Sequence, residues 1–202
     1  MTDDAGTERS QRAYARFAGL MYLVVLATHL AGVVLVTIIT GDGAFDDRAQ
    51  RIIASEELYR IALACSLAGS LFTVLLATGL YATLRPVDRN LATMALLFRT
   101  GESVVGPVGI ATSFAVLHAS LAVRDATAFD ADQLGALASM FSSVATTEIA
   151  AIFFSLGSTI FFYVFLRSTY KVMSAWGIFA SLCYAALWFA RLIVPDSPAL
   201  VV

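Results

Sequence analysis

Long apolar stretches alternate with short polar segments along the chain, and this pattern predicts its elements. A helix needs about 20 apolar residues to cross a hydrocarbon core about 30 Å thick. Five stretches are long enough: 15–40, 58–84, 90–123, 130–167 and 172–194. In the fourth, only residues 143–166 need to lie in the membrane. The expected fold class is therefore all-α, a polytopic membrane helix bundle of about five transmembrane helices.

Polar residues at the ends of these stretches mark where helices begin and end. Ser55 can cap the second helix and Asp88 the third, since short oxygen-bearing side chains accept hydrogen bonds from free N–H groups. Asp130 and Gln133 have the spacing of a capping box at the start of the fourth helix. Pro195 stops the fifth helix.

The chain is short enough to form a single domain. We expect a flexible cytoplasmic N-terminus at residues 1–12, one transmembrane helical-bundle domain at 13–195 and a short C-terminal tail at 196–202. The first apolar stretch follows several arginines, but it is too long for a cleaved signal peptide and ends without a small-x-small cleavage pattern. We interpret it as a retained signal anchor.

Composition supports the membrane assignment. Hydrophobic residues make up 59% of the chain and charged residues 14%, whereas soluble domains average about 45–50% and about 25%. The net charge of −2 without a basic cluster gives no indication of nucleic-acid binding. Cys65 and Cys183 lie inside apolar stretches without a CxxC spacing, and we interpret them as small core residues.

Lysine and arginine are unevenly distributed between the two sets of loops. The N-terminus, the loop at 85–89 and the loop at 167–171 together hold seven, and the remaining loops are rich in aspartate. Because basic loops stay in the cytoplasm, the N-terminus is expected inside and the C-terminus outside. The predicted location is the bacterial inner (plasma) membrane, with several passes.

Small residues recur at four-residue spacing within the predicted helices. Examples are Ala15 with Gly19, Gly69 with Thr73, and Gly101 with Val105 and Gly109. Helices in lipid associate through close backbone approach, so we expect these positions to lie at helix contacts.

Several sequence elements carry a resemblance to a known family. They are Leu84-Arg85-Pro86-Val87-Asp88-Arg89-Asn90-Leu91-Ala92, then Phe98-Arg99 with Glu102, and Ile152-Phe153-Phe154-Ser155-Leu156-Gly157-Ser158. From about Arg12 to Val194 the chain resembles a bacterial integral membrane family called domain of unknown function 4386. The resemblance implies a multi-span membrane protein and supplies no reaction. One departure is the segment 168–171, which lacks the proline that such sequences often carry after the fourth helix.

Two charged residues, Arg99 and Glu102, fall in the middle of the third predicted helix. A charge at mid-bilayer costs at least about 2.5–3.5 kcal/mol, so each needs a partner or a role. Their i, i+3 spacing puts them on one face. They can form a self-neutralising ion pair, or a site in which Arg99 holds an anionic group or Glu102 handles a proton.

Glu148 has no basic residue on its face of the fourth predicted helix. A carboxyl buried in apolar surroundings favours its protonated form. Glu148 is therefore a candidate proton donor, with Glu102 as its ionised partner. The alternative is a neutral Glu148 that forms a hydrogen bond with a neighbouring helix.

The remaining polar and aromatic candidates would bind a substrate. His29 lies at a depth comparable to that of Glu102, so a hydrogen bond between them is feasible. Arg191 ends a stripe on the fifth helix that fits an interfacial aromatic belt or the wall of a pocket. Aromatic faces, which can stabilise a cation, complete the set: Phe98, Phe141, Tyr184 and Trp188. The two histidines differ in depth and lack metal-ligand spacing, so no metal or other cofactor is expected.

Three functions fit these residues. The first is acid catalysis on an isoprenoid-like substrate, such as proton-initiated terpene cyclisation or isomerisation. It is suggested by the similar architecture of small multi-span membrane terpene cyclases. The second is non-catalytic binding or sensing of a lipid or small hydrophobic ligand, with Arg99 or Arg191 holding an anionic head. A small proton-linked transporter is the third, which five helices without a repeat make least favoured unless the protein forms a homo-oligomer. The expected partners are the lipid bilayer and a hydrophobic small molecule or prenyl substrate.

Overall fold

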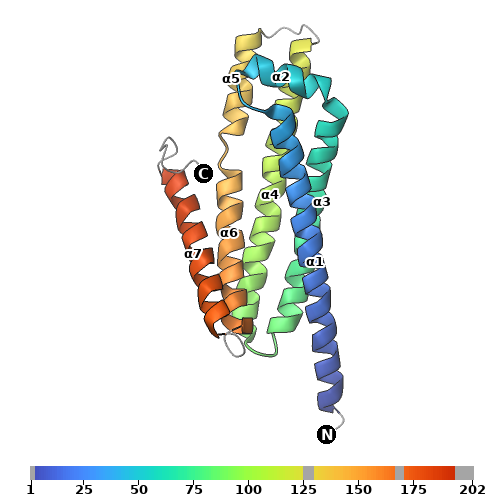
Figure 1. Ribbon diagram of the computed structural model, residues 1–202, viewed down its shortest axis with the longest axis vertical. Coiled ribbons are helices and arrows are strands. Elements are labelled where there is room, and N and C mark those ends of the chain that lie inside the picture. Colours follow the sequence, from blue (N-terminus) through green and yellow to red (C-terminus); the bar gives the residue numbers. More distant parts are fainter. Residues whose placement is uncertain (1–2, 125–129, 167–170, 194–202) are drawn as a thin grey trace. The chain divides into compact units, whose positions relative to one another are not determined.

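The computed structural model of the chain describes residues 3–124, 130–166 and 171–193, where every regular element is a helix (Figure 1). In chain order the helices are α1 (Asp3–Thr40), α2 (Phe45–Ala54), α3 (Glu56–Leu84), α4 (Arg89–Arg124), α5 (Ala131–Ser142), α6 (Thr146–Phe161), the π-helix η1 (Phe162–Leu166) and α7 (Lys171–Ile193). Five spans within them are long and apolar enough to cross a membrane: Ser10–Thr40, Glu56–Leu84, Arg89–Arg124, Asp132–Val164 and Lys171–Ile193. The all-α prediction is confirmed, and the chain is a multi-pass membrane protein.

Two of the three predicted helix caps, at Asp88 and Asp130, form as expected. The Oδ1 atom of Asp88 accepts hydrogen bonds from the backbone N–H groups of Asn90 at 2.9 Å and Leu91 at 3.0 Å. Asp130 and Gln133 form both bonds of the capping box, at 2.8 and 3.2 Å. Ser55 directly precedes α3 and also ends α2. Local side-chain chemistry thus fixes the starts of α4 and α5.

The start of the first helix and the presence of one additional helix differ from the prediction. The first helix begins at Asp3, well before residue 15. The segment before α3 also contains the short helix α2, which the long-stretch pattern did not predict. Ala49 and Ile52 of α2 are buried, whereas its charged residues Asp46, Asp47 and Arg51 are exposed, so its stability comes from packing rather than from length.

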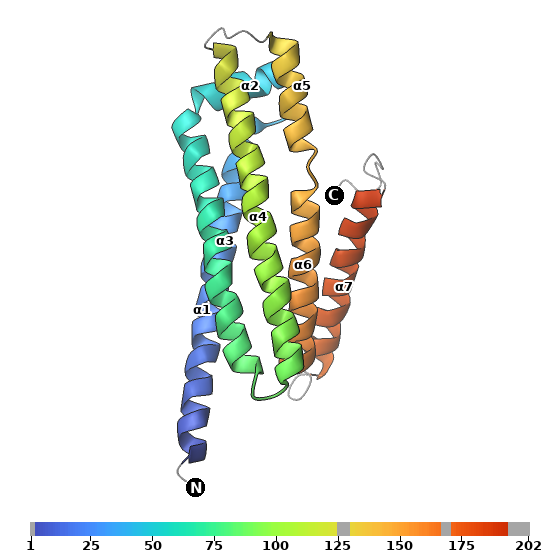
Figure 2. The same cartoon turned by 180° about the vertical axis from the view of Figure 1, so that it is seen from behind.

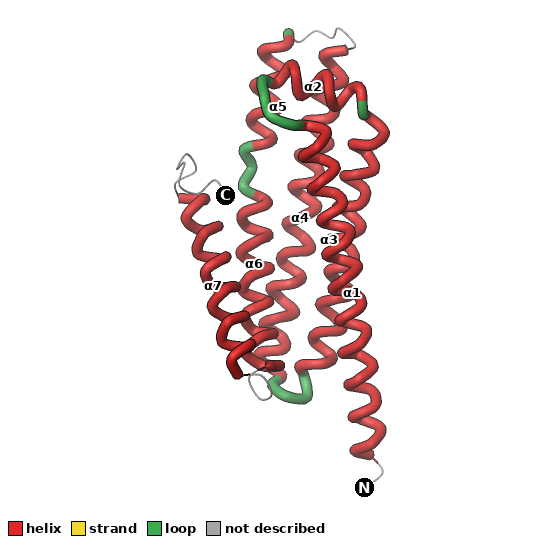
Figure 3. The backbone as a smooth tube through the Cα atoms, viewed as in Figure 1, coloured by secondary structure: helices red, strands yellow, loops and turns green. Residues whose placement is uncertain are grey.

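The fourth predicted helix is not continuous, which corrects the expectation of one helix over residues 130–167. A short non-helical segment separates α5 from α6 (Figure 3). The Oγ atoms of Ser142 and Ser143 each donate a 2.8 Å hydrogen bond, to the carbonyl oxygens of Ala138 and Met140. Hydroxyls that bond carbonyls one turn back weaken a helix slightly, and here two such bonds lie at the end of α5.

The residues fall into two compact units, and α1, α3 and α4 contribute to both. Unit 1 comprises Met1–Val24, Leu71–Val105 and Ala145–Val202. Unit 2 comprises Val25–Ser70 and Gly106–Val144.

Unit 2 has its own apolar core, made of Ile39, Ile52, Tyr59, Leu63 and Leu117. Ile52 brings α2 into this core, and Figure 2 shows α2 lying crosswise to α5. A Cβ added at Gly69 would collide with the ring of His29, so α1 and α3 pack closely at this position. The small-residue prediction is confirmed there.

Unit 1 is built on a second core, made of Leu84, Ala92, Ala95 and Val164. It joins the end of α3, the start of α4 and η1. The Nε2 atom of Gln11 donates a 3.1 Å hydrogen bond to the carbonyl of Thr83, which ties α1 to the end of α3.

The small-residue prediction has a mixed outcome in unit 1. A Cβ at Gly101 would lie 3.0 Å from the ring of Phe153, so α4 and α6 approach closely at this point. Nothing lies within 4 Å of a Cβ at Gly19, so the prediction of a helix contact at Gly19 is wrong.

Candidate functional site around Arg99

Arg99 on α4 is the most deeply buried charged side chain in the part of the chain whose exposure is described, with a relative exposure of 2%. Its Nη1 atom lies 2.9 Å from Oε2 of Glu102, and its Nη2 atom donates a 3.2 Å hydrogen bond to Oγ of Ser158 on α6. The predicted ion pair therefore forms within α4, and the bond from Arg99 to Ser158 connects α4 to α6. The Nε–H group is buried without a hydrogen-bond partner among the described residues.

Aromatic rings enclose the same guanidinium. The Cζ atom of Arg99 lies 4.6 Å from the ring centroid of Phe154 and 6.0 Å from that of Tyr22. Rings at such distances stabilise a cation through their negative faces. A Cβ at Gly157 would lie 3.4–3.5 Å from the Arg99 side chain, in van der Waals contact, so α6 packs directly against this side chain. Arg99 is thus fixed by groups from α1, α4 and α6.

A row of aromatic contacts continues from this cation onto α7. Phe154 meets Tyr184 edge-to-face with ring centroids 6.4 Å apart, and Tyr184 meets Trp188 at 5.9 Å. The Cζ atom of Arg191 lies 5.0 Å from the ring centroid of Trp188. We call this row, from Arg99 through the three rings to Arg191, the aromatic ladder. It links a buried cation to a half-exposed one.

The two helices that carry the aromatic ladder meet at η1. The Oγ atom of Ser174 donates a 2.7 Å hydrogen bond to the carbonyl of Phe162, and a Cβ at Gly177 would lie 2.7 Å from the Phe162 ring. From this junction α6 and α7 separate toward the first turn of α6 and the last turn of α7 (Figures 1 and 2). Arg191 lies in that last turn and Glu148 in that first turn.

The surroundings of Glu148 differ from the expectation, because the expected continuous helix is broken. Glu148 lies in the first turn of α6 and is only half-buried. The positive end of the helix dipole stabilises a carboxylate in this position. No hydrogen bond or ion pair joins the side chain to another of the described residues.

The other predicted binding residues do not all gather at Arg99. Phe98 contacts Phe153, with ring centroids 6.1 Å apart. His29 and Phe141 belong to unit 2. The Nδ1 atom of His29 lies 3.1 Å from the carbonyl oxygen of Val25, within its own helix.

Phe154, Ser158 and Tyr22 contact Arg99, although they were not among the predicted site residues. Ser158 is 59 positions from Arg99 in the chain. Contacts of this kind depend on how helices pack, which spacing within one helix does not reveal. For Phe154 and Ser158, the sequence offers as an indication the run of aromatic and small residues at 153–158.

A family model described as Domain of unknown function (DUF4386) matches residues 17–202. Neither the curated proteins nor the solved structures gave a match.

Proposed function

The chain belongs to the family described as domain of unknown function 4386, and from its own residues we propose that it binds an amphipathic lipid where α6 faces α7. The aromatic ladder carries the proposal, because its contacts run without a gap from a half-exposed arginine to a buried one. In this proposal the protein is a non-catalytic lipid-binding or sensing protein of the bacterial inner membrane.

The chemistry of the aromatic ladder defines the ligand. Arg191 has no carboxylate in ion-pair range among the described residues, so its guanidinium can pair with an anionic head group. The rings of Tyr184 and Trp188 offer apolar surface to a hydrocarbon chain. Arg99 already has a carboxylate partner at 2.9 Å. Arg191 is therefore the residue that holds the head.

We expect Arg191→Gln to weaken retention of an anionic lipid about tenfold, since a hydrogen bond to a charged group contributes about 1.5–3 kcal/mol. Trp188→Leu should also weaken it, whereas Phe189→Leu, an exposed aromatic change on the same helix, should not. Native mass spectrometry of the detergent-solubilised protein measures the bound lipid. Equal retention in all three variants would contradict the proposal.

Acid catalysis on an isoprenoid is a second candidate, favoured by the half-buried Glu148 without a basic partner among the described residues. Glu148 would protonate a carbon–carbon double bond, and the cation would lose a proton after cyclisation or isomerisation, so no co-reactant is needed. Two observations weigh against it. Glu102 is held by Arg99, and the face of Phe154 nearest the pair is occupied by the guanidinium rather than free for a carbocation.

An added prenyl substrate separates the two candidates. Recovery of unmodified lipid from wild type and from Glu148→Gln protein supports binding. A cyclised or isomerised product that wild type forms and Glu148→Gln protein does not form would support catalysis and overturn the binding proposal.

A further inference from the structure

Basic side chains gather where α3 ends and where α4 and α7 begin, in unit 1. Arg85 and Arg89 flank the α3–α4 turn and Lys171 begins α7. Arg12 and Arg16 lie on α1, and the hydrogen bond from Gln11 to Thr83 holds that part of α1 beside the end of α3. All five are exposed. We call these five residues the basic surface.

Four of the five members of the basic surface have no acidic partner among the described residues. The side chains of Arg16, Arg85, Arg89 and Lys171 form no ion pair with any of the described residues. Oδ1 of the nearby Asp88 carboxylate accepts the backbone N–H groups that it caps, and this carboxylate forms no ion pair with these four side chains.

The arginines at the start of α3 and the end of α4, in contrast, form ion pairs. Arg60 lies 2.8 Å from a carboxylate oxygen of Glu56, and Arg124 lies 3.6 Å from the other oxygen of the same group. Arg51 donates hydrogen bonds to the backbone carbonyls of Thr40 and Asp42. These three arginines therefore have ion-pair or hydrogen-bond partners within the chain.

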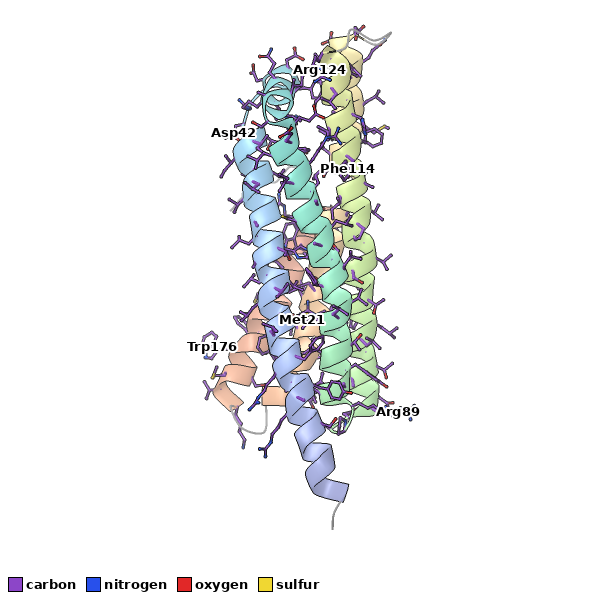
Figure 4. All side chains as sticks on the ribbon, turned by 90° about the vertical axis from the view of Figure 1, so that its right-hand side faces the viewer. Met21, Asp42, Arg89, Phe114, Arg124 and Trp176 are labelled. Atoms are coloured by element: carbon purple, nitrogen blue, oxygen red, sulfur yellow. The ribbon has the colours of Figure 1, made fainter. Side chains whose placement is uncertain are left out.

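Exposed aromatic residues lie close to the basic surface. Tyr14 and Phe17 on α1 are 47% and 39% exposed, and Trp176 on α7 is 67% exposed. Figure 4 shows Arg89 at the start of α4 and Trp176 near the start of α7. Amphipathic rings beside basic residues are typical of the level at which a membrane protein passes the lipid head groups.

We infer that the basic surface binds the phosphate head groups of anionic phospholipids in one leaflet. Unmatched guanidinium groups pair with phosphate oxygens, and the neighbouring rings hold the helices at head-group depth. This inference is independent of the lipid proposed for the aromatic ladder, because it uses other residues and a lipid of the bulk membrane.

Native mass spectrometry of the delipidated full chain, titrated with phosphatidylglycerol or phosphatidylcholine, tests the inference. Phosphatidylglycerol should bind in preference. The double variant Arg85→Gln/Arg89→Gln should bind it about thirtyfold more weakly, because each basic residue near an anionic surface contributes severalfold. The matched control is Arg60→Gln/Arg124→Gln, which removes the same charge from the arginines paired with Glu56 and should change binding little.

Three outcomes would overturn the inference. They are equal binding of the two lipids, equal loss in the two double variants, and competition by inorganic phosphate at the concentration of the lipid, which would indicate a site for the free anion. Retention of lipid through Arg191 is measured on the same samples. Failure of the basic surface is therefore distinguishable from failure of the aromatic ladder.

Discussion

The contacts of Arg99 explain how one chain can keep a guanidinium inside an apolar bundle. A buried charge is tolerated when it is paired and hydrogen-bonded, and Glu102, Ser158 and Phe154 meet that need from two helices. Such pairs add little net stability over apolar residues of similar size, because burying both charges is costly. Removing one partner of the pair is strongly destabilising, however, because it leaves the other charge buried without compensation.

Arg99→Met should lower the free energy of unfolding by about 3–5 kcal/mol, because Glu102 then loses its ion partner. The matched control is Arg60→Met, which breaks the exposed pair with Glu56 and should cost less than about 1 kcal/mol. Equilibrium unfolding in mixed micelles measures both. Equal losses in the two variants would show that the buried pair is not required for stability.

Among the elements, the junction of α6 and α7 carries the clearest consequence for function. A π-helix shifts the register of backbone hydrogen bonds and is often found at functional sites. In η1 the carbonyl of Phe162 is bonded by Ser174, and the Phe162 ring lies against the backbone of Gly177. The absence of a side chain at Gly177 therefore sets how closely α7 approaches α6 and how the aromatic ladder is aligned.

Gly177→Ala should destabilise the protein by about 1–3 kcal/mol, since the new Cβ would lie 2.7 Å from the Phe162 ring and overpack the junction. Gly19→Ala is the control, because nothing lies within 4 Å of its Cβ. It should be neutral or stabilising by up to about 1 kcal/mol through helix propensity. Thermal unfolding of both proteins measures these changes in stability, which should be a loss for Gly177→Ala and no loss for Gly19→Ala. A melting temperature for Gly177→Ala at or above that of wild type would contradict the close approach.

The elements also show what the sequence could and could not reveal. Caps at Asp88 and Asp130 were predictable because they depend on residues two or three positions away. The break after Ser142 was not, since no proline or glycine marks it and the apolar pattern continues through it. The partner of Glu102 was predictable from i, i+3 spacing. Phe154 was not, because its contact with Arg99 depends on how α4 and α6 pack.

At the scale of the whole molecule, charge asymmetry predicts how the chain lies in the membrane. The positive-inside rule places the N-terminus and the α3–α4 turn in the cytoplasm and the α1–α2 segment outside. Anionic lipids are enriched in the cytoplasmic leaflet, so the same asymmetry would bring the basic surface to the lipids that it is proposed to bind.

Cysteine labelling in intact cells tests this orientation, on a background with Cys65→Ala and Cys183→Ala. Asp42→Cys, in the segment after α1, should react with a membrane-impermeant thiol reagent from outside. Val87→Cys, at an exposed position in the α3–α4 turn, should react only after the membrane is permeabilised. The reverse pattern would refute the predicted orientation. It would also remove the physical basis for the basic surface as a site for cytoplasmic-leaflet lipids. The aromatic ladder would keep its geometry, because its contacts lie within the chain and do not depend on orientation.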